Sequence, residues 1–337
     1  MTKKQAGFTL IELMISLVLG LIVVAAAGML LITGQKSYLL QQGSGDIQDN
    51  ANFGLDFIVR DLRLANLDAM DALLNDRSFI GGIVLTSSAP SAAARVIDST
   101  GTTVIYSNLN DTLVGSTVLP GLLSRSSGMT AGSAPAWTGI SNVQESNQNL
   151  LSDQLVIQYR PIEIGGYDCE GKEITTTDRI IVQRYFLRED ANKNSNEPNK
   201  PLALACDAGW YAITGKPTTI QAYGDAGEII MKRVDYLHFL LGVENANGTH
   251  RYMSVNDYLA KTTNFTIAGP RITSVQIGML VRSNTAVGNE STINNDQEFQ
   301  VLDKKIKVKS TNSTVKYVRQ VVSQSVALRN ALGGRGS

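Results

Sequence analysis

Histidine and cysteine are scarce in this chain, whose 337 residues include two of each. So few imidazoles and thiols exclude a zinc ribbon and leave little material for a metal site built from His and Cys. An excess of charge is also missing, because 30 Lys and Arg residues balance 30 Asp and Glu residues. A general nucleic-acid-binding protein would instead carry a basic surface. We therefore expect no metal, no cofactor and no nucleic-acid partner.

The motifs of several common enzyme classes are absent as well. The sequence has no glycine-rich phosphate loop followed by Lys and Ser or Thr, no Gly-x-Ser-x-Gly and no His-Glu-x-x-His. His238 stands in an apolar segment and His250 in an Asn-Gly turn, which are ordinary structural positions for a histidine. We expect no catalytic residue and no enzyme activity.

One long apolar run is present, at the N-terminus. From Phe8 to Ile32 the only charged residue is Glu12, and the uncharged part after it has about 20 residues, which as a helix spans about 30 Å, the thickness of a bilayer core. Lys3 and Lys4 precede this run, and such basic residues stay on the cytoplasmic side. The sequence therefore predicts a single span of the bacterial inner membrane, with the rest of the chain in the periplasm.

A cleaved secretory signal and a plain membrane anchor are two alternatives for this run. Ala25, Ala26 and Ala27 would be the small residues at a signal cleavage site. A signal peptide, however, has an apolar region of about 7–15 residues, which is shorter than this one. Neither alternative explains Glu12, because a carboxylate inside a membrane span costs roughly 2.5–3.5 kcal/mol and is usually functional.

The residues around Glu12 carry a family resemblance. The stretch KKQAGFTLIELMIS, residues 3–16, resembles the leader and N-terminal motif of type IV pilin-like proteins. This resemblance implies that a prepilin peptidase cleaves between Gly7 and Phe8 and methylates the new amine of Phe8. It also implies that Glu12 meets the Phe8 amine of a neighbouring subunit and sets the assembly register, since two buried opposite charges offset each other. Pairing of Glu12 with the amine of its own chain is the alternative.

Helical periodicity continues after the apolar run. Apolar residues recur every three or four positions, which predicts an amphipathic continuation of the helix over residues 33–70. The stripe consists of Ile47, Ala51, Leu55, Ile58, Leu62, Ala65 and Ala69. Gly34, Gly43, Gly45 and Gly54 interrupt this segment, and they either mark a bend or are simply tolerated.

Strand-like segments separated by long loops fill most of the remainder. We expect strands at Phe79–Thr86, Thr103–Tyr106, Gln154–Arg160, Arg179–Leu187, Glu228–Val243, Ile272–Arg282, Phe299–Val308 and Val315–Leu328. Because helix comes first and strands follow, the fold class is α+β, with a long N-terminal helix packed on an antiparallel β-sheet head. The expected organisation is a leader (1–7), a transmembrane helix (8–32), its amphipathic continuation (33–70), a β-rich head (71–332) and a flexible tail (333–337).

The two cysteines, Cys169 and Cys206, would lie together in an oxidising periplasm. An even pair in one domain then favours a disulfide over two free thiols. Closing a loop of about 38 residues would stabilise the fold by roughly 4 kcal/mol.

Two charged segments suggest ligands, and each has a simpler explanation. Residues 190–197 place oxygen-bearing side chains at alternate positions, as a calcium loop does, but Ser195 and Pro201 stand where such a loop needs Gly and Glu. Five lysines at 304, 305, 307, 309 and 316 form a basic run that could contact phosphates. We expect a solvated loop and a solvated hairpin face instead.

Further stretches are similar to the PilW family of minor pilins. They are Phe57–Ala65, Tyr167–Gly171, Leu237–Val243 and the segments around Arg319 and Ala327–Asn330. The resemblance implies a minor pilin that joins other minor pilins and the major pilin in a tip complex that primes a type IV pilus and could carry a tip adhesin. A type II secretion pseudopilin and a tip binding module for adhesion or DNA uptake are the alternatives.

Overall fold

A computed structural model describes the chain over residues 7–70, 72–87, 94–97, 100, 102–110, 113, 121–129, 139–194, 197–262, 268–287, 293–294, 296–309, 311 and 314–332. The expected tail at 333–337 and all of the expected leader except Gly7 lie outside these residues.

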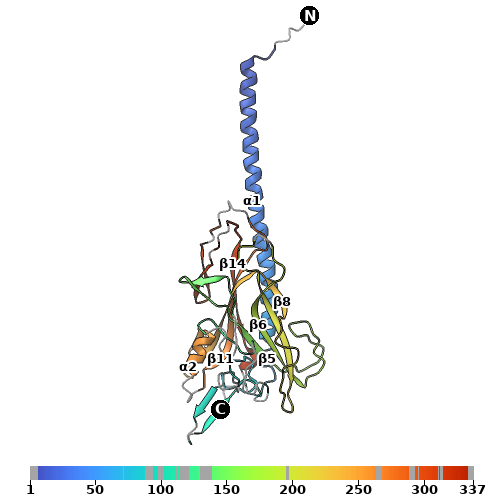
Figure 1. Ribbon diagram of the computed structural model, residues 1–337, viewed down its shortest axis with the longest axis vertical. Helices are drawn as coiled ribbons and strands as arrows, with labels where there is room; N and C mark the ends of the chain where they lie inside the picture. The colour runs from blue at the N-terminus through green and yellow to red at the C-terminus, as the bar shows by residue number, and fades with distance from the viewer. Residues whose placement is uncertain are drawn as a thin grey trace.

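A single long helix leads into a head of antiparallel strands (Figure 1). The elements are α1 (Leu10–Leu62), β1 (Ala94–Ile97), β2 (Thr103–Tyr106), β3 (Val143–Glu145), β4 (Gln148–Asn149), β5 (Leu155–Tyr159), β6 (Arg179–Glu189), β7 (Leu202–Ala212), β8 (Glu228–Lys232), β9 (Val234–Glu244), β10 (His250–Met253), α2 (Val255–Thr262), β11 (Arg271–Arg282), β12 (Glu298–Val301), β13 (Lys304–Val308), β14 (Arg319–Ala327) and the 3₁₀ turn η1 (Arg329–Ala331). The architecture confirms the α+β class.

Helix α1 is 53 residues long and changes character along its length. Its first half is apolar and exposed, whereas the second half buries one stripe in the head. The predicted stripe is buried at Ile47, Ala51, Leu55, Ile58, Leu62 and Ala65.

The end of α1 differs from the expectation of helix up to residue 70, because α1 stops at Leu62. Asn66 and Asp68 have φ angles of 64° and 49°, left-handed conformations that short polar residues tolerate but a helix cannot contain. The side-chain amide oxygen of Asn66 accepts a hydrogen bond of 2.8 Å from the Gly82 N–H. The backbone N–H of Asn66 donates to the Gln158 carbonyl. These contacts turn the chain into the head before Ala69 is reached.

Two four-stranded sheets enclose the main core. Their strand orders are β5-β6-β7-β8 and β10-β9-β11-β14, and every pairing is antiparallel. The stripe of α1 packs into the core that these sheets share, beside β8, β11 and β14. A third sheet, β12-β13-β3-β4, joins a separate apolar cluster that includes Tyr236 and Leu280.

Three expected strands are broken or absent. The segment 79–86 forms one isolated bridge, between Ile83 and Ile157, because the Asn108 side chain accepts the N–H groups of Leu85 and Thr86 that a strand partner would take. The segment 228–243 divides into β8 and β9 at Arg233, where φ is 58°. The segment 299–308 lies in the hairpin of β12 and β13, which turns at Leu302, where φ is 55°.

Five strands were not expected from the sequence, namely β1, β3, β4, β7 and β10. Strand β7 is central, since it pairs with both β6 and β8. Its sequence LALACDAGWYA is rich in Ala and also contains Asp and Gly, residues that are depleted in strands. Burial of β7 between two neighbours overrides that propensity.

Candidate functional site: the N-terminal helix and its attachment to the head

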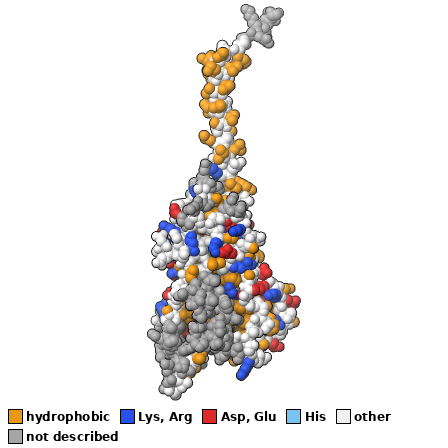
Figure 2. All heavy atoms as spheres, viewed as in Figure 1, with side chains coloured by type: hydrophobic (Ala, Val, Ile, Leu, Met, Phe, Trp, Pro, Cys, Tyr) orange, Lys and Arg blue, Asp and Glu red, His pale blue; other side chains and the backbone are white. Residues whose placement is uncertain are grey.

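The first half of α1 extends out of the head with its apolar side chains exposed. Leu10, Leu21 and Val24 are 80%, 69% and 72% exposed, and Figure 2 shows this stalk covered with hydrophobic side chains. Among the described residues, α1 is the one helix long and apolar enough to cross a membrane. Such exposure in water would be costly, so this segment fits a membrane or a bundle of similar helices.

Glu12 lies at the start of α1, where it forms a capping box with Thr9. One carboxylate oxygen accepts the Thr9 N–H at 2.9 Å and the Thr9 hydroxyl at 2.8 Å, and the Glu12 N–H donates to that hydroxyl at 3.3 Å. The box satisfies helix N–H groups that have no partner within the helix. The structure therefore holds the carboxylate close to the Gly7–Phe8 bond, within its own chain.

Two glycines let the head approach α1 closely. A Cβ on Gly54 would lie 2.3 Å from Met231 Cε and 3.0 Å from Met231 Cβ, and one on Gly43 would lie 3.2 Å from Val318. By contrast, a Cβ on Gly34 or Gly45 would have no atom within 4 Å. Gly43 and Gly54 are thus packing positions, and Gly34 and Gly45 are tolerated.

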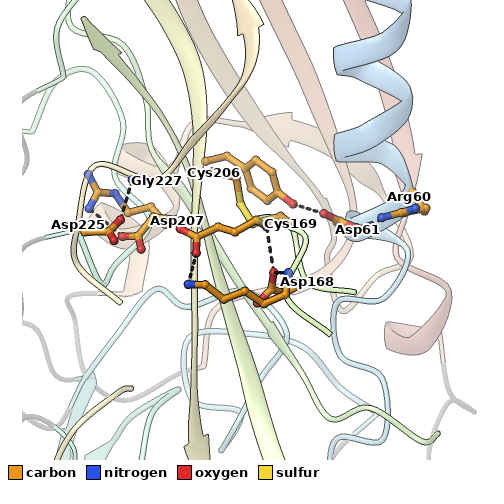
Figure 3. Close-up of a disulfide and its surroundings, with 12 residues drawn as sticks. Arg60, Asp61, Asp168, Cys169, Cys206, Asp207, Asp225 and Gly227 are labelled. Carbon is orange, nitrogen blue, oxygen red and sulfur yellow. Dashed lines mark hydrogen bonds and ion pairs between the residues drawn. A yellow bond between two sulfur atoms is a disulfide. The ribbon is translucent and has the colours of Figure 1, made fainter. Parts of the chain in front are cut away.

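The end of α1 is fastened to the sheet beside a disulfide (Figure 3). Asp61 is buried and accepts a hydrogen bond of 2.6 Å from the Tyr185 hydroxyl of β6. Burial raises the pKa of Asp61, which the hydrogen bond from Tyr185 partly opposes. Cys206 lies opposite Tyr185 in the pairing of β6 with β7 and is joined to Cys169, with the two Cα atoms 6.1 Å apart. The disulfide therefore sits directly at the junction of helix and head.

A buried ionic network fixes the loop for which the sequence suggested calcium. Arg233 donates to Asp190 at 3.0 Å and to Glu197 at 2.8 Å, and Arg282 donates to the other oxygen of Glu197 at 2.7 Å. Arg319 and Arg282 both contact Asp235. The acidic side chains of this loop are bound to arginines, and Ser195 lies outside the described residues.

His238 is buried between two carboxylates. Its Nδ1 lies 2.6 Å from Asp153 and its Nε2 lies 2.7 Å from Asp303 at the turn of the β12–β13 hairpin. Burial lowers the pKa of His238, but the two carboxylates outweigh that effect and raise the pKa to about 9. The charged imidazole ties the hairpin to β9, which is a structural role.

A group of three carboxylates lies on the other side of the disulfide. Oxygen atoms of Glu170, Asp207 and Asp225 lie within 4.8 Å of one another. Lys172 binds Glu170, and Arg184 lies 3.6 Å from Asp207. Burial raises the pKa of Asp207 to about 6, although Arg184 opposes the shift.

The basic run is largely paired within the head. Lys305 and Lys307 lie 2.8 Å and 3.3 Å from Glu298, on the opposite strand of the hairpin. Lys304 lies 3.7 Å from Asp303, and Lys309 donates to the Ser141 carbonyl at 2.8 Å. This arrangement offers little unpaired positive charge for a phosphate backbone.

The apolar stripe of α1 is predictable from the sequence, but the polar residues that attach the helix to the head are not. Asp61 and Tyr185 are 124 positions apart, and the buried arginines are distant from their acids. The sequence does hold one signal for such contacts, namely polar residues within apolar strands, such as Tyr185 and Arg282. A polar group that is buried with its strand needs a hydrogen-bond or ion-pair partner. The sequence does not say which partner each one finds.

Comparisons with known protein families match two parts of the chain, the N-terminal segment and the second half of the head. Residues 2–28 match the prokaryotic N-terminal methylation motif, and residues 184–330 match a family described as PilW, type IV pilus-assembly protein W. Among solved structures, the chain is similar to the type IV-like pilin TTHA1219 from Thermus thermophilus, with 13% identity over 53% of this chain and 78% of that one. The TM-score between the two structures is 0.26. No curated protein matches the chain.

Proposed function

We propose that this chain, which is a type IV pilin-like protein resembling the PilW family of minor pilins, helps to start the assembly of a type IV pilus in a tip complex with other minor pilins. The observation that carries the proposal is the long, exposed apolar helix, which is attached to a large head. Glu12, five residues after Gly7, is the acid of the capping box at its start. The matched methylation motif, residues 2–28, covers Gly7, Glu12 and the first part of this helix.

The proposed life of the protein begins in the inner membrane. Residues 8–32 span the bilayer, residues 1–7 face the cytoplasm, and the head from residue 71 lies in the periplasm, as the basic leader favours. A prepilin peptidase cleaves after Gly7 and methylates Phe8. The mature subunit then leaves the membrane for a filament that contains the major pilin, other minor pilins and, at its tip, an adhesin.

Two physical features support a minor, tip-associated role. The head is large, and in its described part long loops connect β5 to β6 (160–178) and β7 to β8 (213–227), which would be awkward to repeat along a whole filament. The helix is held to that head by Asp61 and by close packing at Gly43 and Gly54, and a disulfide within the head lies next to the joint. A subunit that is pulled by its helix into a growing filament needs such a rigid connection.

Glu12 is the proposed register residue. Cleavage after Gly7 creates an amine at Phe8, one residue before the Thr9 N–H that the Glu12 carboxylate already accepts. In a bundle of apolar helices the amine of a neighbouring subunit would be a buried cation, and this carboxylate would offset its charge.

A substitution series at Glu12 tests the proposal in cells that express the full chain. Glu12→Ala and Glu12→Gln should leave cleavage intact, as N-terminal mass spectrometry of the Phe8 product shows, but should reduce surface pili and co-purification with other pilins. Glu12→Asp should give an intermediate yield. Gly7→Val is the processing control and should leave an uncleaved precursor in the membrane.

The same cells decide between the alternatives. Deletion of the gene should lower the number of surface pili. If deletion leaves pili intact and stops protein secretion, the chain is a type II secretion pseudopilin. If pili form normally without it but lose adhesion or DNA uptake, it is a binding module, and the priming role is wrong.

A further inference from the structure

Strand β14 lies at the edge of its sheet. Its nine residues, Arg319–Ala327, pair with β11 without any shift in register. Among the described strands none pairs with its other side. Ser323, Gln324, Ser325 and Ala327 are exposed. An edge strand offers unpaired backbone groups that can bind another extended chain.

The pairing pattern shows which backbone groups face outward. Just beyond the two ends of the strand pair, the Ser283 N–H donates to the Val318 carbonyl at 2.9 Å and the Leu328 N–H donates to the Thr273 carbonyl at 2.9 Å. In an antiparallel pair, every second residue directs its backbone N–H and C=O groups to the neighbouring strand. In β14 the even-numbered residues direct these groups to β11. The N–H and C=O groups of the odd-numbered residues, from Arg319 to Ala327, therefore point to the open edge.

This edge carries none of the residue-level features that normally protect one. From Gln320 to Ala327 the strand has no proline, no charged side chain and no bulge. Other edges in the described part of the chain are short or guarded. Strands β4 and β10 have two and four residues, β8 carries charges at both ends and a register shift against β7, and Val84 and Gly82 cover β5.

The open edge runs alongside α1. Val318, just before β14, lies against Gly43 of the helix, and Asn330, just after it, donates to the carbonyl of Arg63 at 2.9 Å. The strand therefore follows the helix from the level at which α1 enters the head to the level at which it ends. A chain added to this edge would lie beside the head, parallel to the helix axis, rather than on the far end of the molecule.

We propose that the open edge of β14 binds an extended strand from the head of a laterally neighbouring pilin-type subunit. Strand addition explains why the edge is long and unguarded, and the alignment with α1 assigns the partner to a subunit anchored in the same bilayer. The absence of charge from Gln320 to Ala327 selects a neutral, apolar or hydroxyl-rich strand. This inference rests on the proposed assembly function and names its lateral contact.

Site-specific photo-cross-linking in cells that express the full chain tests the contact. p-Benzoylphenylalanine replaces Ser325 on the edge or, as the control, the exposed Glu163 of a distant loop. We expect the edge position, but not the control, to capture a chain whose mass spectrum identifies a prepilin-type N-terminus. No capture at Ser325, or capture of a protein without that N-terminus, overturns the inference.

Edge variants separate strand addition from simple proximity. Ser323→Pro removes one outward N–H and should reduce capture about tenfold, whereas Ser323→Thr keeps the N–H and should capture normally. Ser323→Lys keeps the strand intact and should also reduce capture, because an edge lysine opposes pairing. Formation of the Cys169–Cys206 disulfide verifies folding of each variant, and Ser323→Lys decides if Ser323→Pro does not fold.

The outcomes distinguish this inference from the proposed function. If capture is insensitive to Ser323→Pro and Ser323→Lys, the edge is not a strand-addition site, even though deletion of the gene still reduces pili. If deletion has no effect on pili, the assembly function fails, and a pilin-type partner captured at the edge then belongs to a different filament.

Discussion

The Tyr185 hydroxyl donates a hydrogen bond of 2.6 Å to the carboxylate of Asp61, and both side chains are buried. One residue belongs to the last turn of α1 and the other to the middle of β6. Cys206, opposite Tyr185, adds a covalent link to Cys169 at the same place. This buried hydrogen bond joins the end of the helix to the sheet inside an apolar core.

Tyr185→Phe should lower the free energy of unfolding by about 1–3 kcal/mol, because a buried carboxylate loses its hydrogen bond. Urea unfolding of the full chain in detergent measures the change. Tyr236→Phe is the matched control, since the buried hydroxyl of Tyr236 has no partner among the described residues, and its removal should cost little. Equal losses in the two variants would contradict the role of Asp61.

Two glycine substitutions in α1 should have opposite effects. Gly54→Val should destabilise the protein by about 1–3 kcal/mol, because the new side chain collides with Met231. Gly45→Ala meets no atom within 4 Å and should stabilise the helix by up to about 1 kcal/mol. Thermal unfolding of the two variants provides the measurement. A neutral Gly54→Val would mean that β8 does not pack closely on α1.

Loss of the disulfide should lower stability and abundance together. Cys169→Ser opens a link between residues 37 positions apart, for which chain entropy gives roughly 4 kcal/mol. Proteolysis of the unfolded fraction should then reduce the amount of the protein in cells. Peptide mapping without reductant should recover Cys169 joined to Cys206 in the native chain. Two thiols that react with an alkylating reagent under native conditions would refute the pairing.

The stability of the head should fall as the pH rises from about 6.5 to about 9. The pKa of His238 is about 9 in the folded protein and about 6.5 in the unfolded chain, so folding favours the protonated form. The stabilisation is complete below pH 6.5 and is lost through pH 9, on the order of 3 kcal/mol in total. Unfolding measured against pH should show this slope.

Two variants assign that slope to a residue. His238→Asn should flatten it. Asp207→Asn should leave that slope unchanged. It should instead reduce a separate loss of stability as the pH rises from about 4 to about 6, because the pKa of Asp207 is raised to about 6 in the folded state. A slope that persists in His238→Asn would show that another group binds the proton.

Those parts of this protein that depend on local pattern are predictable from its amino-acid sequence. The apolar run, the spacing of Gly7, Phe8 and Glu12, and the buried stripe on α1 are periodic or contiguous features, and each residue there is interpretable from its near neighbours. The segment 272–282, which forms most of β11, alternates between apolar and polar residues over much of its length and is predictable for the same reason.

Long-range packing determines where the chain departs from its local preferences. Arg233 and Leu302 adopt positive φ and break segments that are strand-like along their length, and the Ala-rich β7 becomes a central strand because neighbours on both sides bury it. The partners of Asp61 and His238 also depend on the tertiary structure. A buried charged group requires a partner, and that partner can come from any distance along the chain. Pairings of this kind depend on which strands become neighbours, and that information is absent from a single sequence.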